Sequence, residues 1–468
     1  MKIKRLCLAV LVVISMSLTA CKDEETSEAS KENSKAKAVA ASKAKSQAQA
    51  VTKKKKIPDE HNFNLTLTLV IDLNGDGIAT SSMKDDFVHF DIDNDGFAEK
   101  TAWLDGKDGF LAIDRNANGK IDDASELFGR TDKYANGFEA LKELDSNSDG
   151  ILDANDSAWN DLRLWQDANN DGALHQDNEK ELSSLTERGV EKIELSYKNQ
   201  DDTDGNGNEH RTQANVYWKD GKKTVIEDIY FQHDNAKTLD LTQLDISDEE
   251  WKELDKLPHI DAFGNVHSLW VAMSSDATLK TMVKNYVAAS PAERVNLLDD
   301  LIYRWTGSAG VEPYSRDPTK ENWGHVMDAR QLVALEKLTG EPYFGTYNGE
   351  DRDPNPHGKA APLLIAQYEK FKTYVSAQIA AQMDYPEIFS PVVVVSRKTL
   401  GGDWSKFNDL VNDKFKNGEI EEVKILFNIA IDLGNYSPWY RRDLAKNLDK
   451  FDGELKAIIE EISKNKQK

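Results

Sequence analysis

The chain has 468 residues, of which 82 are Asp or Glu and 59 are Lys or Arg, giving a net charge of -23. This acidity excludes the basic surface that nucleic-acid binding requires, and it suits either a cation-binding protein or one kept soluble by charge. The length predicts two or three folded units. Both cysteines lie within the first 21 residues, so no disulfide is expected in the folded part.

Residues 1–20 have the features of a signal peptide. Basic residues within the first five positions precede an apolar run at 6–18, which is shorter than the roughly 20 residues a membrane-spanning helix needs. The run ends in Leu-Thr-Ala-Cys at Cys21, which resembles a bacterial lipobox. We therefore expect Cys21 to carry lipid that attaches the protein to a membrane. The alternative is an ordinary cleaved signal peptide with a chance cysteine.

Two further features concern location. Lys22 stands where inner-membrane lipoproteins of Gram-negative bacteria carry an aspartate, so the resemblance implies an outer-membrane lipoprotein of the cell envelope, on either its periplasmic or its surface face. Residues 21–58 are rich in Lys, Ala and Ser and contain no aromatic residue, which predicts a disordered tether.

Residues 59–234 are dominated by one repeated pattern, Asp-x-Asp/Asn-x-Asp/Asn-Gly. We number its five occurrences loops 1 to 5, and they lie at 72–77, 91–96, 114–119, 145–150 and 167–172, with a weaker cluster at 202–207. Calcium takes six to eight oxygen ligands; side chains at loop positions 1, 3 and 5, the carbonyl of position 7 and an acid near position 12 supply them, while glycine at position 6 permits the turn.

Asx-rich turns also form without metal, so a single loop could be either a metal site or a metal-free turn. Five loops predict a module that binds several Ca²⁺ ions, and Mg²⁺ is disfavoured because it demands octahedral geometry. Loop 4 matches the pattern best and is expected to be EF-hand-like, with a helix at 137–144 before it and the start of a second helix at 158–162 after it. Its predicted ligands are Asp145, Asn147, Asp149, the carbonyl of Ile151, Asp153 and Asp156.

The other loops supply similar ligand sets. Loops 1 and 2 follow predicted strands at 65–69 and 87–90, so we expect calcium-bearing β-turns there. Asp105 and Asp108 are alternatives for closing loop 2, and Glu181 is an alternative to Glu179 for closing loop 5. The predicted ligands are Asp72, Asn74, Asp76 and the carbonyl of Ile78 in loop 1; Asp91, Asp93, Asp95 and the carbonyl of Phe97 in loop 2; Asp114, Asn116, Asn118, the carbonyl of Lys120 and Glu126 in loop 3, where Asp122 is position 9; and Asp167, Asn169, Asp171, the carbonyl of Ala173 and Glu179 in loop 5.

The segments 114–129, 144–150 and 164–167 resemble a signature of large RTX-type secreted bacterial proteins. In some of these proteins the region is a self-processing module that calcium folds and that then cleaves an Asp-Pro bond just before its first calcium loop. Here residues 65–71 contain no Asp-Pro, and the two such pairs lie downstream at 317–318 and 353–354. We therefore predict calcium-dependent folding without self-cleavage.

The second half of the chain reads as helical. Strands at 213–218 and 224–231, joined by a hairpin turn, precede it; residues 235–385 form a predicted helical domain and 386–468 a C-terminal helical region. Residues 392–395 fit either a buried strand or the start of an apolar helix. The fold class is thus α+β, and the predicted helices cover 248–254, 295–305, 328–338, 361–383, 406–415, 419–433 and 441–463. The RTX resemblance extends to about residue 385, over segments at 257–269, 301–307 and 328–337, and brings no assigned activity.

No catalytic residues are predicted, because the sequence has no zinc motif, nucleophile elbow or phosphate-binding loop. His89 and His267 lie in apolar contexts typical of structural histidines. Arg304, Trp305 and Arg330 fit either a binding groove or helix packing. These observations favour a lipid-anchored, calcium-stabilised scaffold that presents its helical part to an unknown protein partner and binds no nucleic acid. The alternatives are a self-processing protein or a toxin or effector whose activity lies after residue 385.

Overall fold

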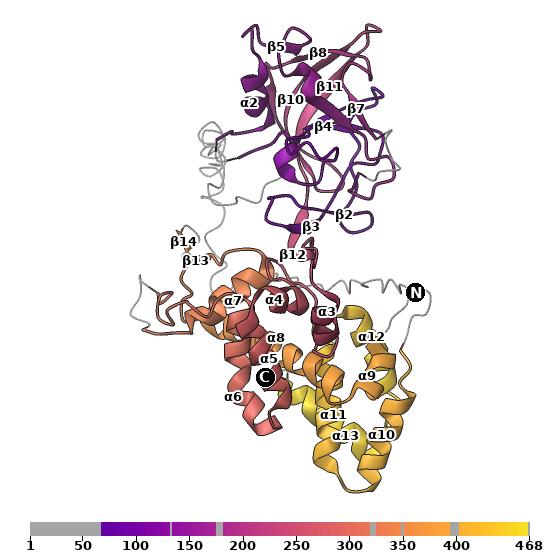
Figure 1. The fold of residues 1–468 in the computed structure, drawn as a ribbon, viewed down its shortest axis with the longest axis vertical. Helices are drawn as coiled ribbons and strands as arrows, with labels where there is room; N and C mark the ends of the chain where they lie inside the picture. The colour runs from indigo at the N-terminus through magenta and orange to yellow at the C-terminus, as the bar shows by residue number, and fades with distance from the viewer. Residues whose placement is uncertain are drawn as a thin grey trace, which may run out of the picture. The chain divides into compact units, whose positions relative to one another are not determined.

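The computed structural model describes residues 67–131, 133–174, 181–318, 324–347, 351–393 and 402–466. The predicted signal peptide, Cys21, the tether and Glu179 lie outside these residues. The described chain has mixed α and β structure, with strands dominating up to Asp240 and helices after it (Figure 1). Among the described helices, none is both long and apolar enough to cross a membrane.

The strand-rich part is built on a nine-stranded sheet in the order β5-β8-β10-β11-β1-β4-β6-β7, with β9 paired to β10. Its strands are β1 Leu67–Ile71, β4 Gly109–Ile113, β5 Ile151–Asp153, β6 Leu162–Trp165, β7 Leu182–Ser184, β8 Val190–Glu194, β9 Lys198–Thr203, β10 Glu209–Trp218 and β11 Lys223–Tyr230. A second sheet has the order β12-β3-β2, formed by His233–Asp240, Phe97–Thr101 and Val88–Phe90, and a third pairs β13 Gly345–Tyr347 with β14 Asp351–Asp353.

β1 separates two hydrophobic cores. Its apolar run is buried on both faces, because successive side chains of a strand point to opposite sides. Leu69 and Ile71 pack into a core that contains Phe138 and Trp159. Val70 packs on the other side, in a core whose aromatic rings include the Trp103–Phe110 pair at 4.5 Å between centroids. The predicted strand at 65–69 therefore forms, within the described residues, as the central strand β1.

A short helix precedes loop 4, as predicted, but no second helix follows it. α2 Gly137–Leu141 continues as the 3₁₀ turn Lys142–Leu144, and its N-cap is Asn136, whose side chain accepts the N–H of Glu139. After the loop, the 3₁₀ turn Trp159–Asp161 leads directly into β6. Of the helix expected to start at 158–162 only this 3₁₀ turn forms, because Leu162 and Leu164 are drawn into the sheet by pairing with β4.

The helical part contains two cores that share α8. The helices are α3 Asp248–Leu254, α4 Leu269–Ser275, α5 Ala277–Ala288, α6 Pro291–Trp305, α7 Ala329–Thr339, α8 Ala361–Met383, α9 Pro386–Val393, α10 Ser405–Lys416, α11 Ile420–Leu433, α12 Pro438–Leu448 and α13 Gly453–Lys466. Tyr368 and Phe371 of α8 pack with α3 to α7, whereas Ala377 and Ala381 pack with α9 to α13.

Most predicted helices form at their expected positions, and four features differ from the prediction. The predicted helix 441–463 is two helices, α12 and α13, separated at residues 449–452. Val392 belongs to the end of helix α9, while residues 394–395 lie outside the described range. Helices α4 and α5 were not predicted. The strand-rich part also extends beyond its predicted end at residue 234, because β12 pairs with β3 as far as Asp240.

Replacing Gly137 by alanine should destabilise the fold by about 1–3 kcal/mol, because an added Cβ would lie 2.6 Å from both Leu69 Cγ and the carbonyl oxygen of Phe128. Urea denaturation followed by circular dichroism measures this loss. Gly310→Ala is the matched control, since a Cβ there meets no atom within 4 Å. Equal stability of the two variants would contradict the packing described around β1.

Replacing Asp228 by asparagine should make stability less dependent on pH. Asp228 is fully buried on β11 and accepts the N–H of Gly137 at 2.7 Å, and burial raises its pKa to about 7. Because the folded-state pKa lies above the ordinary value of 3.8, the stability this group contributes is fully present below about pH 4 and is lost as the pH rises to about 7.

The free energy of unfolding of Asp228→Asn, relative to the parent chain, should therefore increase between pH 5 and pH 8, by on the order of 3 kcal/mol. Denaturation at both pH values and at constant calcium measures it, with the exposed Asp161→Asn as the control. A relative stability that stays constant over this range would refute the assignment.

Candidate metal-binding loops

The five loops share one backbone conformation. Position 4 adopts a positive φ in every loop, including at Ala117 (57°) and Ser148 (60°), which L-residues rarely adopt. The glycine at position 6 also has a positive φ, from 71° at Gly172 to 95° at Gly77. Five different sequences thus fold into the same turn, and glycine at position 6 is needed for its conformation.

The position 1 aspartate holds each turn together. In loop 4, Asp145 Oδ1 accepts the N–H of Asp149 at 3.2 Å, and Oδ2 accepts the N–H of Gly150 at 2.9 Å. Asp91, Asp114 and Asp167 accept the equivalent two bonds in loops 2, 3 and 5. Asp72 of loop 1 accepts from Asn74, Gly75 and Gly77. The first predicted ligand of every loop therefore faces the loop interior.

The closing acids of loops 3 and 4 lie where the sequence predicted them. Asp156 accepts the N–H of Ser146, at position 2, at 2.8 Å and that of Asp153, at position 9, at 3.0 Å. In loop 3, Glu126 accepts the N–H groups of Arg115 and Asp122 at 3.1 and 3.0 Å. Glu126 stands at position 13 and Asp156 at position 12, yet both accept hydrogen bonds from the N–H groups of positions 2 and 9 of their loops.

In loops 1 and 2 the hydrogen bond from position 2 is accepted by acids that the sequence had not assigned to those loops, Asp108 and Glu99. Glu99, nine positions into loop 2, accepts the N–H of Ile92 at 3.1 Å. Asp108 lies against loop 1, not loop 2, and accepts the N–H groups of Leu73 at 3.2 Å and Ala79 at 2.9 Å. Sequence spacing missed Glu99, which belongs to strand β3, and assigned Asp108 to loop 2 as an alternative. Asp108 reaches loop 1 because Ile71 pairs with Gly109 between β1 and β4.

Loop 5 and the weaker cluster at 202–207 differ from the other loops. Asp167 of loop 5 is fully buried and also accepts the indole N–H of Trp103 at 2.7 Å. Glu181, the remaining alternative for closing it, is buried just before β7. In the cluster, the Asp204 side chain accepts from Thr80 and from the backbone of Asn206 and Asn208. The Asp204 carboxylate thus stabilises its turn through hydrogen bonds to neighbouring protein groups.

Loop 2 gathers three carboxylates. Oxygens of Asp91, Asp93 and Glu99 all lie within 4.8 Å of one another. Asp93 Oδ1 is buried and has no hydrogen-bond partner, and no Lys or Arg among the described residues forms an ion pair with any of the three. The arrangement therefore leaves a buried oxygen without a hydrogen-bond partner, and three acidic groups without a positive partner, among the described residues.

Burial makes ionisation of these acids costly. It raises the pKa of Glu99 to about 9 and that of Asp93 to about 7, and it raises that of Asp91 as well. In loop 1, burial raises the pKa of Asp108 to about 6. A cation would offset this cost, because an opposite charge within a few ångströms favours the ionised form. The donor set, all oxygen, fits a hard cation such as Ca²⁺.

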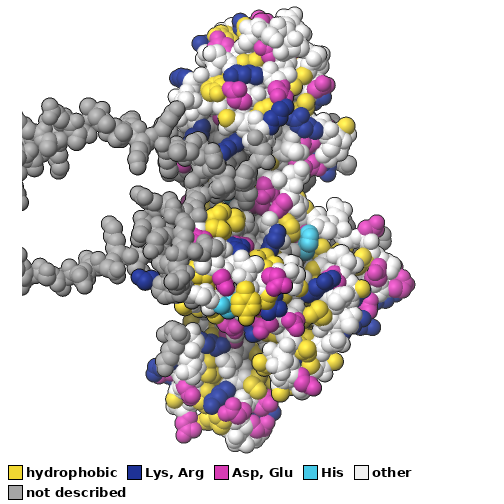
Figure 2. Space-filling view, turned by 90° about the vertical axis from the view of Figure 1, so that its left-hand side faces the viewer, with side chains coloured by type: hydrophobic (Ala, Val, Ile, Leu, Met, Phe, Trp, Pro, Cys, Tyr) yellow, Lys and Arg dark blue, Asp and Glu magenta, His cyan; other side chains and the backbone are white. Residues whose placement is uncertain are grey.

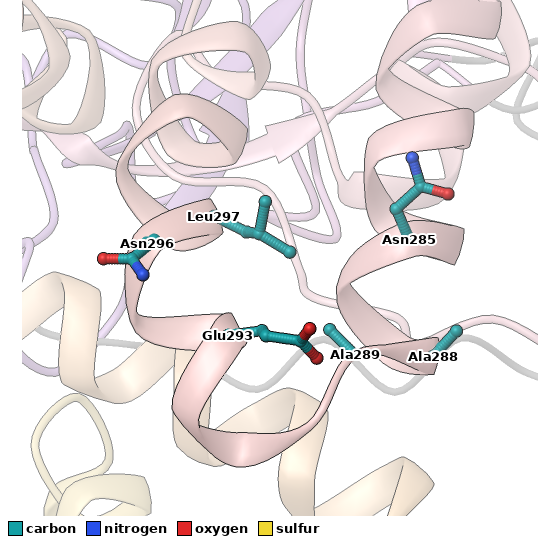
Figure 3. Close-up of a pocket in the computed structure, with 6 residues that line it drawn as sticks. All are labelled: Asn285, Ala288, Ala289, Glu293, Asn296 and Leu297. Carbon is teal, nitrogen blue, oxygen red and sulfur yellow. The ribbon is translucent and has the colours of Figure 1, made fainter.

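The helical part has an open pocket of different character. It has a volume of about 470 Å³ and is lined by Asn285, Ala288 and Ala289 of α5 and by Glu293, Asn296 and Leu297 of α6 (Figure 3). Its one carboxylate, Glu293, caps α6 by accepting from the backbone N–H and the hydroxyl of Ser290 at 2.9 and 2.7 Å. Glu293 thus serves the helix terminus.

The residues considered for a groove are engaged in packing. Arg304 pairs with Asp276, and the indole of Trp305 donates to the carbonyl of His267 at 2.8 Å. Arg330 pairs with Asp328 and lies over the ring of Tyr303. His89 is kept neutral by burial, which lowers its pKa to about 4. On the face shown in Figure 2, Asp and Glu are interspersed with Lys and Arg, so the acidic excess is not gathered into one patch on that face.

Part of the chain is similar to known proteins. Residues 69–232 match the model of the SPM domain family. The chain is also 35% identical over 269 residues to the iron-regulated protein FrpA of Neisseria meningitidis serogroup C, an alignment that covers 56% of this chain and 22% of that protein. The chain thus spans about a fifth of the length of this curated relative. The strand-rich part with its five loops is the part that the SPM domain model matches.

Proposed function

We propose that this protein is a lipid-anchored, calcium-binding protein of the bacterial outer membrane, and that its helical part binds a protein partner. The observation that carries the calcium assignment is the convergence of Asp91, Asp93 and Glu99 in loop 2, with a buried oxygen that has no partner among the described residues. The anchor rests on the lipobox at Cys21. The similarity of this chain to FrpA, together with the signal peptide predicted from the sequence, supports an RTX-related, exported protein.

The proposed ligand sets follow the loop geometry. In loop 2 they are Asp91, Asp93, Asp95, the carbonyl of Phe97, and Glu99 as the closing acid. In loop 1, Asp108 closes a set begun by Asp72, Asn74, Asp76 and the carbonyl of Ile78. Loops 3 and 4 keep the sets predicted from the sequence, closed by Glu126 and Asp156. Each set offers the oxygen-rich, adaptable coordination that Ca²⁺ takes and that Mg²⁺, which requires near-octahedral geometry, takes less readily.

Calcium binding should be coupled to folding. Without a cation, buried acids such as Glu99 and Asp93 must be protonated or leave their positions, which weakens the packing around the loops. Sites with dissociation constants of about 10⁻⁴–10⁻³ M would suffice outside the cell, where calcium is plentiful. The loops would then stabilise the folded part at the membrane surface, from which the helices are presented. We do not propose self-cleavage, because no Asp-Pro bond precedes loop 1.

Calcium should bind to several sites and raise the stability of the protein. The chain from Lys22 onward, stripped with EDTA, is titrated with Ca²⁺ by calorimetry while circular dichroism follows thermal unfolding. Each occupied site should add about 2.7 kcal/mol when free calcium is 100 times its dissociation constant. A gel of the same samples should show no discrete N-terminal fragment. A folded chain that binds no calcium at millimolar concentration would mean that the loops are metal-free turns.

The assignment of Asp108 to loop 1 can be tested against its neighbour. Asp108→Asn should weaken calcium binding at loop 1 by at least about tenfold, because it removes the proposed closing charge. Asp105→Asn should leave that site unchanged, since Asp105 pairs with Lys107 at the surface. Native mass spectrometry counts the bound ions, and hydrogen exchange of residues 72–79 reports loop 1. Equal losses in both variants, or in neither, would overturn the assignment.

A further inference from the structure

Loop 2 contacts a turn of the helical part directly. The turn is formed by residues 263–266, where Phe263 and Val266 are bridged. The side-chain amide of Asn265 donates to Asp95 Oδ2, at position 5 of loop 2, over 2.5 Å. Two residues further along each segment, the ring of Phe97 packs against that of His267 with 4.8 Å between centroids. Both predicted ligand residues 95 and 97 are thus in contact with the chain after β12.

The closing acid of loop 2 is connected to the same turn through β12. Strands β3 and β12 lie side by side (Figure 1), and Glu99 stands opposite Thr238 in this pair. The Thr238 hydroxyl donates to the carbonyl of Gly264 at 2.7 Å. Phe97 stands opposite Asp240, whose carboxylate accepts from His267 at 3.1 Å and from the N–H of Ser268 at 3.2 Å. One strand pair thus connects loop 2 to the turn.

The turn itself is held rigidly against α7. Gly264 has a φ of 50°, and a Cβ there would lie 2.5 Å from the carbonyl oxygen of Lys337. The N–H of Asn265 donates to that same carbonyl at 2.8 Å. These contacts hold the backbone of Asn265 against α7, and its side-chain amide points from there to Asp95.

Loop 2 differs from loops 1, 3 and 4 in its hydrogen bond to the chain after Asp240. Among the described residues, loops 1, 3 and 4 form no hydrogen bond with the chain after Asp240. Their closing acids bind only their own loops and adjoining residues. Loops 3 and 4 therefore serve as internal references for any effect specific to loop 2.

We propose that cation binding at loop 2 and docking of the turn 263–266 are coupled, with Asn265 as a positioning residue for the ligand Asp95. Asp95 Oδ1 accepts the N–H of Phe97 at 3.0 Å, and Asn265 holds Oδ2, so the carboxylate is fixed at both oxygens. Outer partners of this kind orient ligands and commonly change metal affinity by 10- to 100-fold. Because coupling is reciprocal, calcium at loop 2 also stabilises the turn. This inference rests on the proposed calcium binding, and it makes the arrangement of the helical part dependent on calcium.

Asn265→Ala should lower calcium affinity at loop 2 by about tenfold and leave loops 3 and 4 unchanged. Hydrogen exchange with and without Ca²⁺, on the chain from Lys22 onward, follows residues 91–99 for loop 2 and 263–268 for the turn. In the parent chain calcium should slow exchange in both segments, and in Asn265→Ala the effect at 263–268 should be lost. Asn296→Ala, an exposed asparagine of α6, is the matched control and should behave as the parent chain.

A second variant approaches the coupling from the metal side. Glu99→Gln should abolish calcium-dependent protection of 263–268 while protection of loop 4 at 145–156 persists, which also shows that the variant is folded. If the parent chain shows no calcium response anywhere, the proposed function fails. If calcium protects loop 2 but exchange at 263–268 is insensitive to calcium, or if Asn265→Ala binds calcium at loop 2 as the parent does, the coupling alone is refuted.

Discussion

A carboxylate removed from water must be compensated, and this constraint governs the strand-rich half of the protein. The inward acids of the five loops are partly compensated by backbone N–H groups, which the shared turn directs at the position 1 aspartate and at the closing acid. In loop 2 this compensation is incomplete, because three carboxylates converge and one buried oxygen of Asp93 has no partner among the described residues. The remaining deficit is the physical basis for proposing a cation there.

The sheets determine which acids meet. β1 runs through the middle of the N-terminal part and is buried on both faces, so its neighbours are fixed by two cores. Its pairing with β4 brings Asp108 to loop 1, and the pairing of β3 with β12 ties loop 2 to the segment after Asp240. The loops are therefore parts of a continuous strand framework, and a cation in any of them would act on that framework.

The similarities agree with this division of the chain. The SPM domain match ends at residue 232, and the alignment with FrpA, at 269 residues, is longer than that match. The helical part contains an open pocket whose one carboxylate, Glu293, caps α6, and its Arg304 and Arg330 pair with neighbouring acids.

The sequence by itself determined the five loops, their position 1 aspartates, the closing acids Asp156 and Glu126, and most helices, because each depends on residues close together in the chain. Periodicity and a serine N-cap were sufficient for helix α3, and in the structure Ser247 also forms a capping box with Glu250. Local signals failed where a strand competed for the same residues, as at 158–162, where pairing with β4 replaced the expected helix by β6.

Only the tertiary structure decided which acids close loops 1 and 2 and which loop contacts the helical part. Asp108 and Leu73 are separated by 35 positions in the sequence and meet because two strands pair. Asn265 reaches Asp95 across 170 positions because β12 returns beside β3. Spacing rules describe a single turn of backbone. Contacts made through a sheet depend on strand order and register, which are fixed by the burial of whole strands and not by the residues of any one loop.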